Sequence, residues 1–327
     1  MMSKELPLWY SAGQKNDLAG LPLWQQLAYA GILLLSRMVA LIPWSWYGGM
    51  GRALGSLAWR LDKKHRKITL DNITASFSEL SPGAARELGR RCFQNMSRVF
   101  FEVLALPWMT KRELMARVDY QDPENIAQAL ALGKGGFVLT AHFGNWEVLS
   151  LSLAASGWPG EVIVRPLDFK PLDRFIDQLR TMNGHATLNK NRSARGVLAA
   201  LRRLRLIGVL LDQNVTWQEG VFVDYFGRRA CTNKGLALLA LKTGSPVIPI
   251  FIARQEGNRF KMICHPAVEL IRTGDNTKDV EENTALFTKI IENMVRQYPD
   301  HWFWMHQRWK SKPYESWPKG SGDKARR

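Results

Sequence analysis

The sequence predicts an α/β protein with a mixed central sheet and helices on both of its faces, preceded by a hydrophobic, membrane-anchoring helix at the amino terminus. Three observations support this prediction. Short β-type runs alternate with helical patterns from residue 137 onward, as in a sheet layered between helices. The stretch from about Trp46 to Trp108 has helical periodicity. An apolar run precedes both parts.

The periodicity also locates the individual elements. Apolar residues recur at three- and four-residue intervals in the first part, as at Leu54, Leu57 and Leu61. Ser81-Pro82 opens another helix, because proline fits a first helical turn. The remaining elements follow in two groups. Strands are expected at 137–140, 161–164, 206–211, 246–253 and 260–264, with helices between them at 146–155, 172–182, 194–203 and 234–242.

The apolar run at 27–42 reads LAYAGILLLSRMVALI. It is slightly short for a full membrane span and contains Arg37. Tryptophans flank it at positions 24, 44 and 46, where an interfacial aromatic belt is expected, and basic residues follow. No small-residue cleavage site follows the run. We therefore expect an anchor that dips into or barely crosses a bilayer, with the basic stretch on the cytoplasmic side; a buried core helix is the alternative.

These patterns divide the chain into four parts. Residues 1–25 form a polar amino-terminal segment, and residues 26–47 form the anchor. Residues 48–317 form one large domain, and residues 318–327 form a basic tail that we expect to be disordered.

The charge balance is strongly basic, with 45 Lys and Arg against 29 Asp and Glu. A formal charge of +16 favours a polyanionic partner, namely nucleic acid, an anionic membrane surface or an acidic carrier protein. A solvated basic face without a partner is the alternative. The three cysteines at 92, 231 and 264 are far apart and odd in number. Their spacing excludes a metal-ligand cluster and argues against a disulfide framework, so we expect reduced thiols.

The clearest candidate for chemistry is His142, in the segment Leu139–Glu147 that reads LTAHFGNWE. A strand ends there and a helix starts within a few residues, so His142 is expected at the edge of the sheet where ligands bind. Histidine suits a general base near neutral pH, and a carboxylate on its other ring nitrogen would orient it. Glu147 is five residues away, and Gly144 permits the turn that would bring the two together. No serine or cysteine nucleophile lies nearby, so such a pair would activate a hydroxyl of the substrate. A structural histidine is the alternative.

The His142–Glu147 block resembles the H-x4-D/E motif of glycerolipid-type acyltransferases, and the wider sequence resembles the lipid A biosynthesis (lauroyl/myristoyl-type) acyltransferases. The similarity spans roughly Gly51 to Pro313. Its acidic residue is Glu rather than Asp, and the arginine-bearing motif of soluble glycerol-phosphate acyltransferases is not evident, so a simple glycerol-3-phosphate acceptor is not expected. Further blocks that resemble the family are GRALG at 51–55, Asn72-Ile73 with Phe77, Asp212-Gln213-Asn214, GVFVDYFG at 220–227, PVIP at 246–249 and WFWMHQRWK at 302–310.

The resemblance implies roles for several residues. His142 would take the proton of an acceptor hydroxyl, and Glu147 would orient His142. Arg165, at the end of a predicted strand, sits where family members place a cationic residue for phosphate binding or oxyanion stabilisation; a surface arginine is the alternative. The other expected substrate contacts are Asn145, Arg192 for phosphate, Asp212 and Gln213 in the crevice, Tyr225 (with Phe222 and Phe226, in an acyl groove or simply in the core) and Arg308.

The function implied is a membrane-associated O-acyltransferase. It would move a fatty acyl group from a thioester on acyl carrier protein or coenzyme A to a hydroxyl of a lipid A-type precursor. The expected location is the bacterial inner membrane, with the catalytic domain facing the cytoplasm and binding its anionic surface. No metal or cofactor is expected, and no nucleic acid. The alternatives are an acyltransferase acting on a lysophospholipid, an aminolipid or a glycosylated phosphoinositide and, more remotely, a non-catalytic nucleic-acid-binding protein. Acyl-chain length and the acylated position are not encoded in any pattern we recognise.

Overall fold

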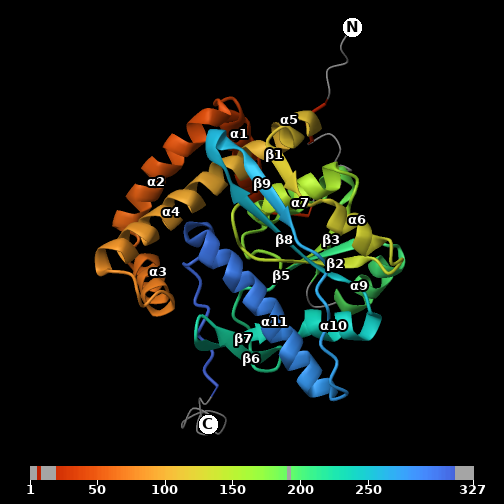
Figure 1. Cartoon of the computed structure of the whole chain (residues 1–327). Helices are drawn as coiled ribbons and strands as arrows, with labels where there is room; N and C mark the ends of the chain where they lie inside the picture. The colour runs from red at the N-terminus through yellow and green to blue at the C-terminus, as the bar shows by residue number, and fades with distance from the viewer. Residues whose placement is uncertain (1–5, 9–19, 190–192, 314–327) are drawn as a thin grey trace, which may run out of the picture.

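The computed structural model describes residues 6–8, 20–189 and 193–313. Its centre is a seven-stranded sheet in the order β1-β9-β8-β2-β5-β3-β4 (Figure 1). All neighbouring strands are parallel except β8 and β9, so the prediction of a mixed central sheet is confirmed. The strands are β1 (Val118–Gln121), β2 (Gly136–Thr140), β3 (Gly160–Val164), β4 (Ala186–Asn189), β5 (Leu206–Leu210), β8 (Val247–Arg254) and β9 (Phe260–Cys264), and a separate antiparallel hairpin pairs β6 (Gly220–Tyr225) with β7 (Arg228–Asn233).

The sheet is buried on both faces by helices, as predicted. Strand side chains alternate between two cores, so Phe137 and Leu139 pack in one core while Val138 packs in the other. The first core contains side chains of α9 (Ser193–Arg202), α10 (Gly235–Thr243) and α11 (Asn276–Gln297). The second contains side chains of α5 (Lys111–Met115), α6 (Glu124–Leu130), α7 (Trp146–Ala155) and the end of α8 (Lys170–Arg180).

The amino-terminal part of the described chain is helical, as its period predicts. It consists of α1 (Leu23–Ala40), α2 (Tyr47–Leu61), α3 (Lys63–Ser76) and α4 (Pro82–Ala105), which lie to the left of the sheet and above it in Figure 1. Helix α2 packs closely on α4, and Gly55 permits this contact, because a Cβ at this position would lie 2.4 Å from the Cα of Gln94. Ser81 caps α4, with Pro82 in the first turn.

The strands and helices predicted between residues 137 and 264 are all present, with ends that differ by at most two residues. The sequence patterns missed the short helices α5 and α6, the edge strands β1 and β4, the β6–β7 hairpin and α11. Edge strands of four residues are too short to establish an alternating pattern.

The anchor residues lie in α1 and in the short turn that follows it. Within the described residues, no single helix meets the length and hydropathy requirement for crossing a bilayer; α1 and the following helical segment Trp44–Leu61 meet it only as a pair, bent by 96°. The predicted anchoring helix is therefore not confirmed as a span. The basic tail at 318–327 lies outside the described residues.

Candidate active site

The turn that carries His142 is shaped by its sequence. Strand β2 ends at Thr140, and Gly144 then adopts φ +60°. A Cβ at Gly144 would lie 1.9 Å from the carbonyl oxygen of Ile252 on β8, so only glycine lets the turn pack against the sheet. Asn145 caps α7 by accepting the backbone N–H of Val148 at 3.1 Å. His142 thus lies at the carboxyl end of β2, as predicted.

A buried carboxylate holds His142, and it belongs to Asp212. Nδ1 of His142 lies 2.9 Å from Oδ1 of Asp212, which follows β5. Oδ2 of the same carboxylate accepts the backbone N–H of His142 at 3.0 Å and the indole N–H of Trp302 at 2.8 Å. Since an ionised carboxylate only accepts, Nδ1 carries the proton and Nε2 keeps its lone pair. His142 is therefore prepared to accept a proton at Nε2.

The electrostatics of Asp212 suit this role. Burial alone would raise its pKa, but the interaction with His142 and the hydrogen bonds from His142 and Trp302 outweigh burial and lower the pKa to about 2. The carboxylate is therefore ionised at neutral pH. It can stabilise the imidazolium that forms when Nε2 takes a proton.

The predicted orientation of His142 by Glu147 is wrong in this geometry. Glu147 lies in the first turn of α7, but its buried carboxylate binds the guanidinium of Arg180, with Oε1 2.5 Å from Nη2, and accepts the indole N–H of Trp146 at 3.0 Å. Burial lowers the pKa of Arg180 and the Glu147 carboxylate raises it, with a net increase. Glu147 follows His142 by five residues, and the turn and the start of α7 between them direct its side chain away from the imidazole. Asp212 instead approaches the imidazole from the end of the neighbouring strand.

The carboxyl-terminal motif closes over the turn. Phe303 donates its backbone N–H to the His142 carbonyl at 3.1 Å, and Gly144 donates to the His301 carbonyl at 2.9 Å. Phe143 and Trp302 form an isolated antiparallel bridge. The segment 301–303 thus fixes both the backbone of His142 and, through the Trp302 indole, its carboxylate partner.

The blocks that resemble the family meet around this closure. Asn72, from the amino-terminal block, donates its side-chain amide to the carbonyls of Trp304 and His306, both at 2.9 Å. The His306 ring accepts the backbone N–H of Asn214 at 2.9 Å. Segments more than 200 residues apart in the sequence therefore support one short turn.

A second buried ionic group supports the turn from the other side. The carboxylate of Glu102 on α4 has no exposed surface, and it binds Arg254 of β8, Arg98 and the side-chain amide of Asn145. Burial would raise the pKa of Glu102, but the two arginines and the amide lower it. Asn145 is itself fully buried, so its predicted contact with substrate is corrected: it joins the helix cap to this ionic group.

The other predicted site residues divide into two sets. Gln213 belongs to the site, with its side-chain nitrogen 3.4 Å from Nε2 of His142. Arg165 is exposed just beyond β3. Arg192 lies outside the described residues. Tyr225 and Phe226 pack in the first core, which is the alternative to a groove, and Phe222 is half-buried on β6.

Arg308 is fully buried rather than open to substrate. It donates to the carbonyls of Cys231 and Gln213 and to the hydroxyl of Thr232. Burial lowers its pKa. Its side chain ties the carboxyl-terminal motif to the Asp212–Gln213 segment, which is a structural role.

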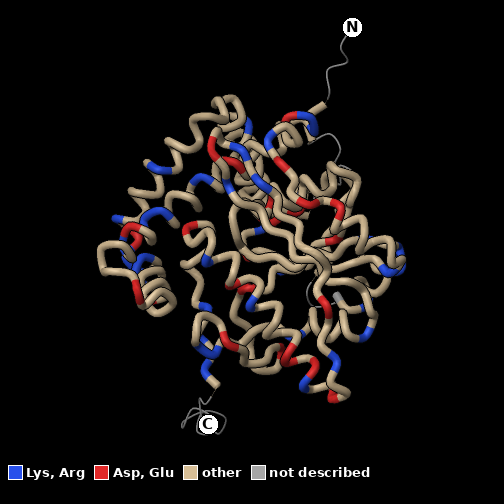
Figure 2. Tube along the Cα trace, in the orientation of Figure 1, with Lys and Arg blue, Asp and Glu red and all other residues tan. Residues whose placement is uncertain are grey.

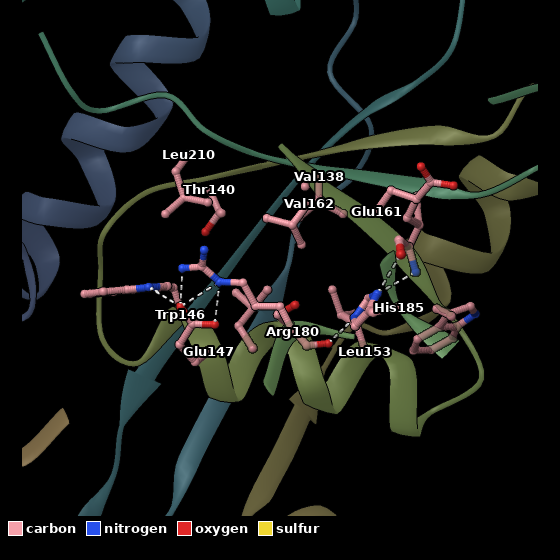
Figure 3. Close-up of a pocket in the computed structure, with 16 residues that line it drawn as sticks. Val138, Thr140, Trp146, Glu147, Leu153, Glu161, Val162, Arg180, His185 and Leu210 are labelled. Carbon is pink, nitrogen blue, oxygen red and sulfur yellow. Dashed lines mark hydrogen bonds and ion pairs between the residues drawn. The ribbon is translucent and has the colours of Figure 1, made fainter. Parts of the chain in front are cut away.

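An apolar cavity lies beside the histidine, between α7 and strands β2, β3 and β5 (Figure 3). Its volume of about 40 Å³ exceeds the roughly 10–15 Å³ that one water needs, so the lining is not close-packed. Glu147 and Arg180 lie at one end and His185 and Glu161 at the other, with aliphatic side chains between them. Trp146 is one of the residues that line the cavity, and its ring centroid lies 5.1 Å from that of His142, so His142 lies one residue away from the cavity lining.

Among the described residues, no group of three or more His, Cys, Asp or Glu side chains is placed to hold a metal ion. The three cysteines are free and buried.

A histidine with an unprotonated Nε2 and a buried carboxylate on Nδ1 has the arrangement of a general base, and an apolar cavity lies nearby. The family described as bacterial lipid A biosynthesis acyltransferase matches residues 15–311. The chain belongs to this family and is an acyltransferase.

The individual relatives differ in what they acylate. The chain is 25% identical to a lipid A biosynthesis lauroyltransferase of Escherichia coli, over 88% of this chain and 92% of that protein. It is 21% identical to a lipid A biosynthesis palmitoleoyltransferase of the same organism, over 81% and 85%. It is also 26% identical to a phosphatidylinositol mannoside acyltransferase of Mycolicibacterium smegmatis, over 68% and 72%.

Two site features escaped sequence reasoning in different ways. Asp212 was identified as a crevice residue but not as the partner of His142, because strand order decides which carboxyl ends are neighbours. The buried acid–base pairs, Glu147 with Arg180 and Glu102 with Arg254, join residues 33 and 152 positions apart. No local pattern indicates such pairs.

Proposed function

We propose that this protein transfers a fatty acyl group from an acyl thioester to a hydroxyl of a phosphorylated saccharolipid of lipid A type. The donor is the thioester of acyl carrier protein or coenzyme A. The observation that carries the proposal is the Asp212–His142 pair, which lies one residue, Trp146, away from the lining of the cavity. The names of the lipid A acyltransferases among the relatives support the acceptor class.

In the proposed reaction, Nε2 of His142 takes the proton of the acceptor hydroxyl as its oxygen attacks the thioester carbonyl. The tetrahedral intermediate then expels the thiolate, which takes the proton back from His142, so ester and thiol leave with no net change in the enzyme. Asp212 holds the imidazole and balances its transient charge. The aliphatic lining next to Trp146 accommodates part of an acyl chain. The chain works at the inner membrane, with the site on the cytoplasmic side.

The test is transfer of a labelled acyl group from acyl carrier protein by detergent-solubilised enzyme, with under-acylated lipid A precursor and a lysophospholipid offered in parallel. His142→Ala is expected to lower transfer by on the order of a hundredfold or more. Transfer that survives His142→Ala would refute the assignment of the base. Transfer only to the lysophospholipid would refute the acceptor.

A second acceptor class has specific support. The mycobacterial phosphatidylinositol mannoside acyltransferase is as similar in identity as the lauroyltransferase, although over less of the chain. A glycosylated phosphoinositide in the same assay tests it, because transfer to that lipid alone would assign the second class.

A further inference from the structure

Helix α1 has two faces of different chemistry, and the inner one is bound to the domain. The hydroxyl of Ser36 donates to the Leu104 carbonyl at 2.6 Å and accepts the indole N–H of Trp108 at 2.7 Å. The Tyr29 hydroxyl donates to the side chain of Gln178 on α8. These polar contacts are buried or half-buried, and they hold α1 along the surface of the domain rather than free of it.

The outer face of α1 is apolar and uncovered. At 100° per residue its outward side chains fall within an arc of about 120° that contains no charged residue. They are 45–70% exposed. We call this set, with the residues of α2 given below, the docking face: Leu23, Trp24, Leu27, Leu34, Leu35 and Met38 of α1.

The helical segment Trp44–Leu61, which contains α2 and follows α1 after a 96° bend, also exposes apolar side chains. Trp46, Leu54, Leu57 and Leu61 recur at helical spacing along it and are 38–71% exposed. This number of exposed large apolar side chains on two consecutive helices is uncommon on a monomer in water and marks a surface that meets a partner.

The charges beside the docking face indicate which partner. Residues 47–76 contain six Lys and Arg against two Asp, and Arg60, Lys63 and Lys64 are exposed around Leu61. The sequence of α1 contains one charged residue, Arg37, and Figure 2 shows Lys and Arg, with some acidic residues, where α2 passes into α3. An apolar strip beside basic residues matches an anionic bilayer. A second copy of a +16 chain would bring the same basic residues together and be repelled.

We propose that α1 lies along the surface of an anionic bilayer and not across it, with the docking face in the boundary between headgroups and acyl chains. The basic residues that follow on α2 and α3 bind headgroup phosphates. Helix α1 packs on α8, and α8 carries Arg180, which lies at one end of the cavity. In this orientation α1 therefore separates α8 and the site from the lipid. The inference rests on the membrane association in the proposed function, and its test does not measure acyl transfer.

The first experiment is flotation of the full chain with phosphatidylcholine vesicles, with or without phosphatidylglycerol. The double variant Leu27→Asp/Leu34→Asp is expected to bind anionic vesicles at least tenfold more weakly than the native chain. The matched control is Leu132→Asp/Leu204→Asp, which places the same two charges at leucines that are also exposed (60% and 53%) outside the docking face. Equal binding by both variants would overturn the proposal. The proposal would also be overturned if the native chain did not bind vesicles but formed a dimer, and the substitutions at Leu27 and Leu34 dissociated that dimer.

The second experiment distinguishes lying from spanning. The native cysteines are buried, so a single cysteine introduced at exposed Gly20, before α1, can be compared with one at exposed Asp224 of β6. In sealed proteoliposomes, a membrane-impermeant maleimide is expected to label both positions in the same fraction of molecules. In a chain that carries both cysteines, labelling of position 20 only in molecules that remain unlabelled at position 224 would show a span and overturn the proposal.

Discussion

Replacing Asp212 with asparagine tests the catalytic geometry most directly, because the change keeps the shape of the side chain. The carboxylate now receives three donors, one on Oδ1 from Nδ1 of His142 and two on Oδ2 from the His142 backbone and the Trp302 indole. Asparagine has one accepting oxygen, and the two donors at the Oδ2 position will hold it there. Its NH2 group then faces Nδ1, which must become an acceptor, so the proton moves to Nε2. The base is lost although the fold remains.

We expect Asp212→Asn to lower kcat by about four orders of magnitude, or about 5 kcal/mol, as when a triad aspartate is replaced by its amide. The assay is transfer of a labelled acyl group from acyl carrier protein, with circular dichroism to verify the fold. The matched control is Asp224→Asn, the same change at an exposed carboxylate that accepts the Gly227 backbone N–H, which is expected to leave kcat unchanged. A folded Asp212→Asn enzyme that retains more than a tenth of the native kcat would refute the assigned tautomer.

Three further results are expected. Arg180→Ala leaves the buried Glu147 carboxylate without its cation and should lower the free energy of unfolding by about 3–5 kcal/mol in denaturant titrations; adding Glu147→Gln should restore part of it, and no restoration would contradict the pairing. Gly144→Ala places a Cβ 1.9 Å from the carbonyl oxygen of Ile252, so this variant is expected to lose solubility or activity. A soluble, fully active variant would show that the turn is less constrained than described. The pKa of Asp212 is about 2 in the folded chain and 3.8 ordinarily. The ionised carboxylate therefore contributes about 2 kcal/mol to the free energy of unfolding above pH 4, and this contribution is lost as the pH falls toward 2. If the native chain and Asp212→Asn lost stability equally in acid, this contribution would be excluded.

The sequence was informative wherever structure follows from local pattern. The strand ending at Thr140, the helix over 146–155 and the position of His142 between them depend on periodicity and on one glycine, and all were predicted. The partner of His142 was not, because β5 lies next to β2 only in the folded sheet. Sequence proximity favoured Glu147 over Asp212 for that reason. Tyr225 and Arg308 were similarly ambiguous, because an aromatic–basic segment has the same composition whether it faces substrate or fills a core.

The closure by the carboxyl-terminal motif has a consequence for the order in which the enzyme becomes competent. Trp302 and Phe303 are among the last described residues to be translated, yet they hold Asp212 and the backbone of His142. A ribosome-bound chain that lacks them presents the sheet and the cavity without an oriented base. In the proposed reaction, a chain truncated before Trp302 is therefore expected to lack transfer activity.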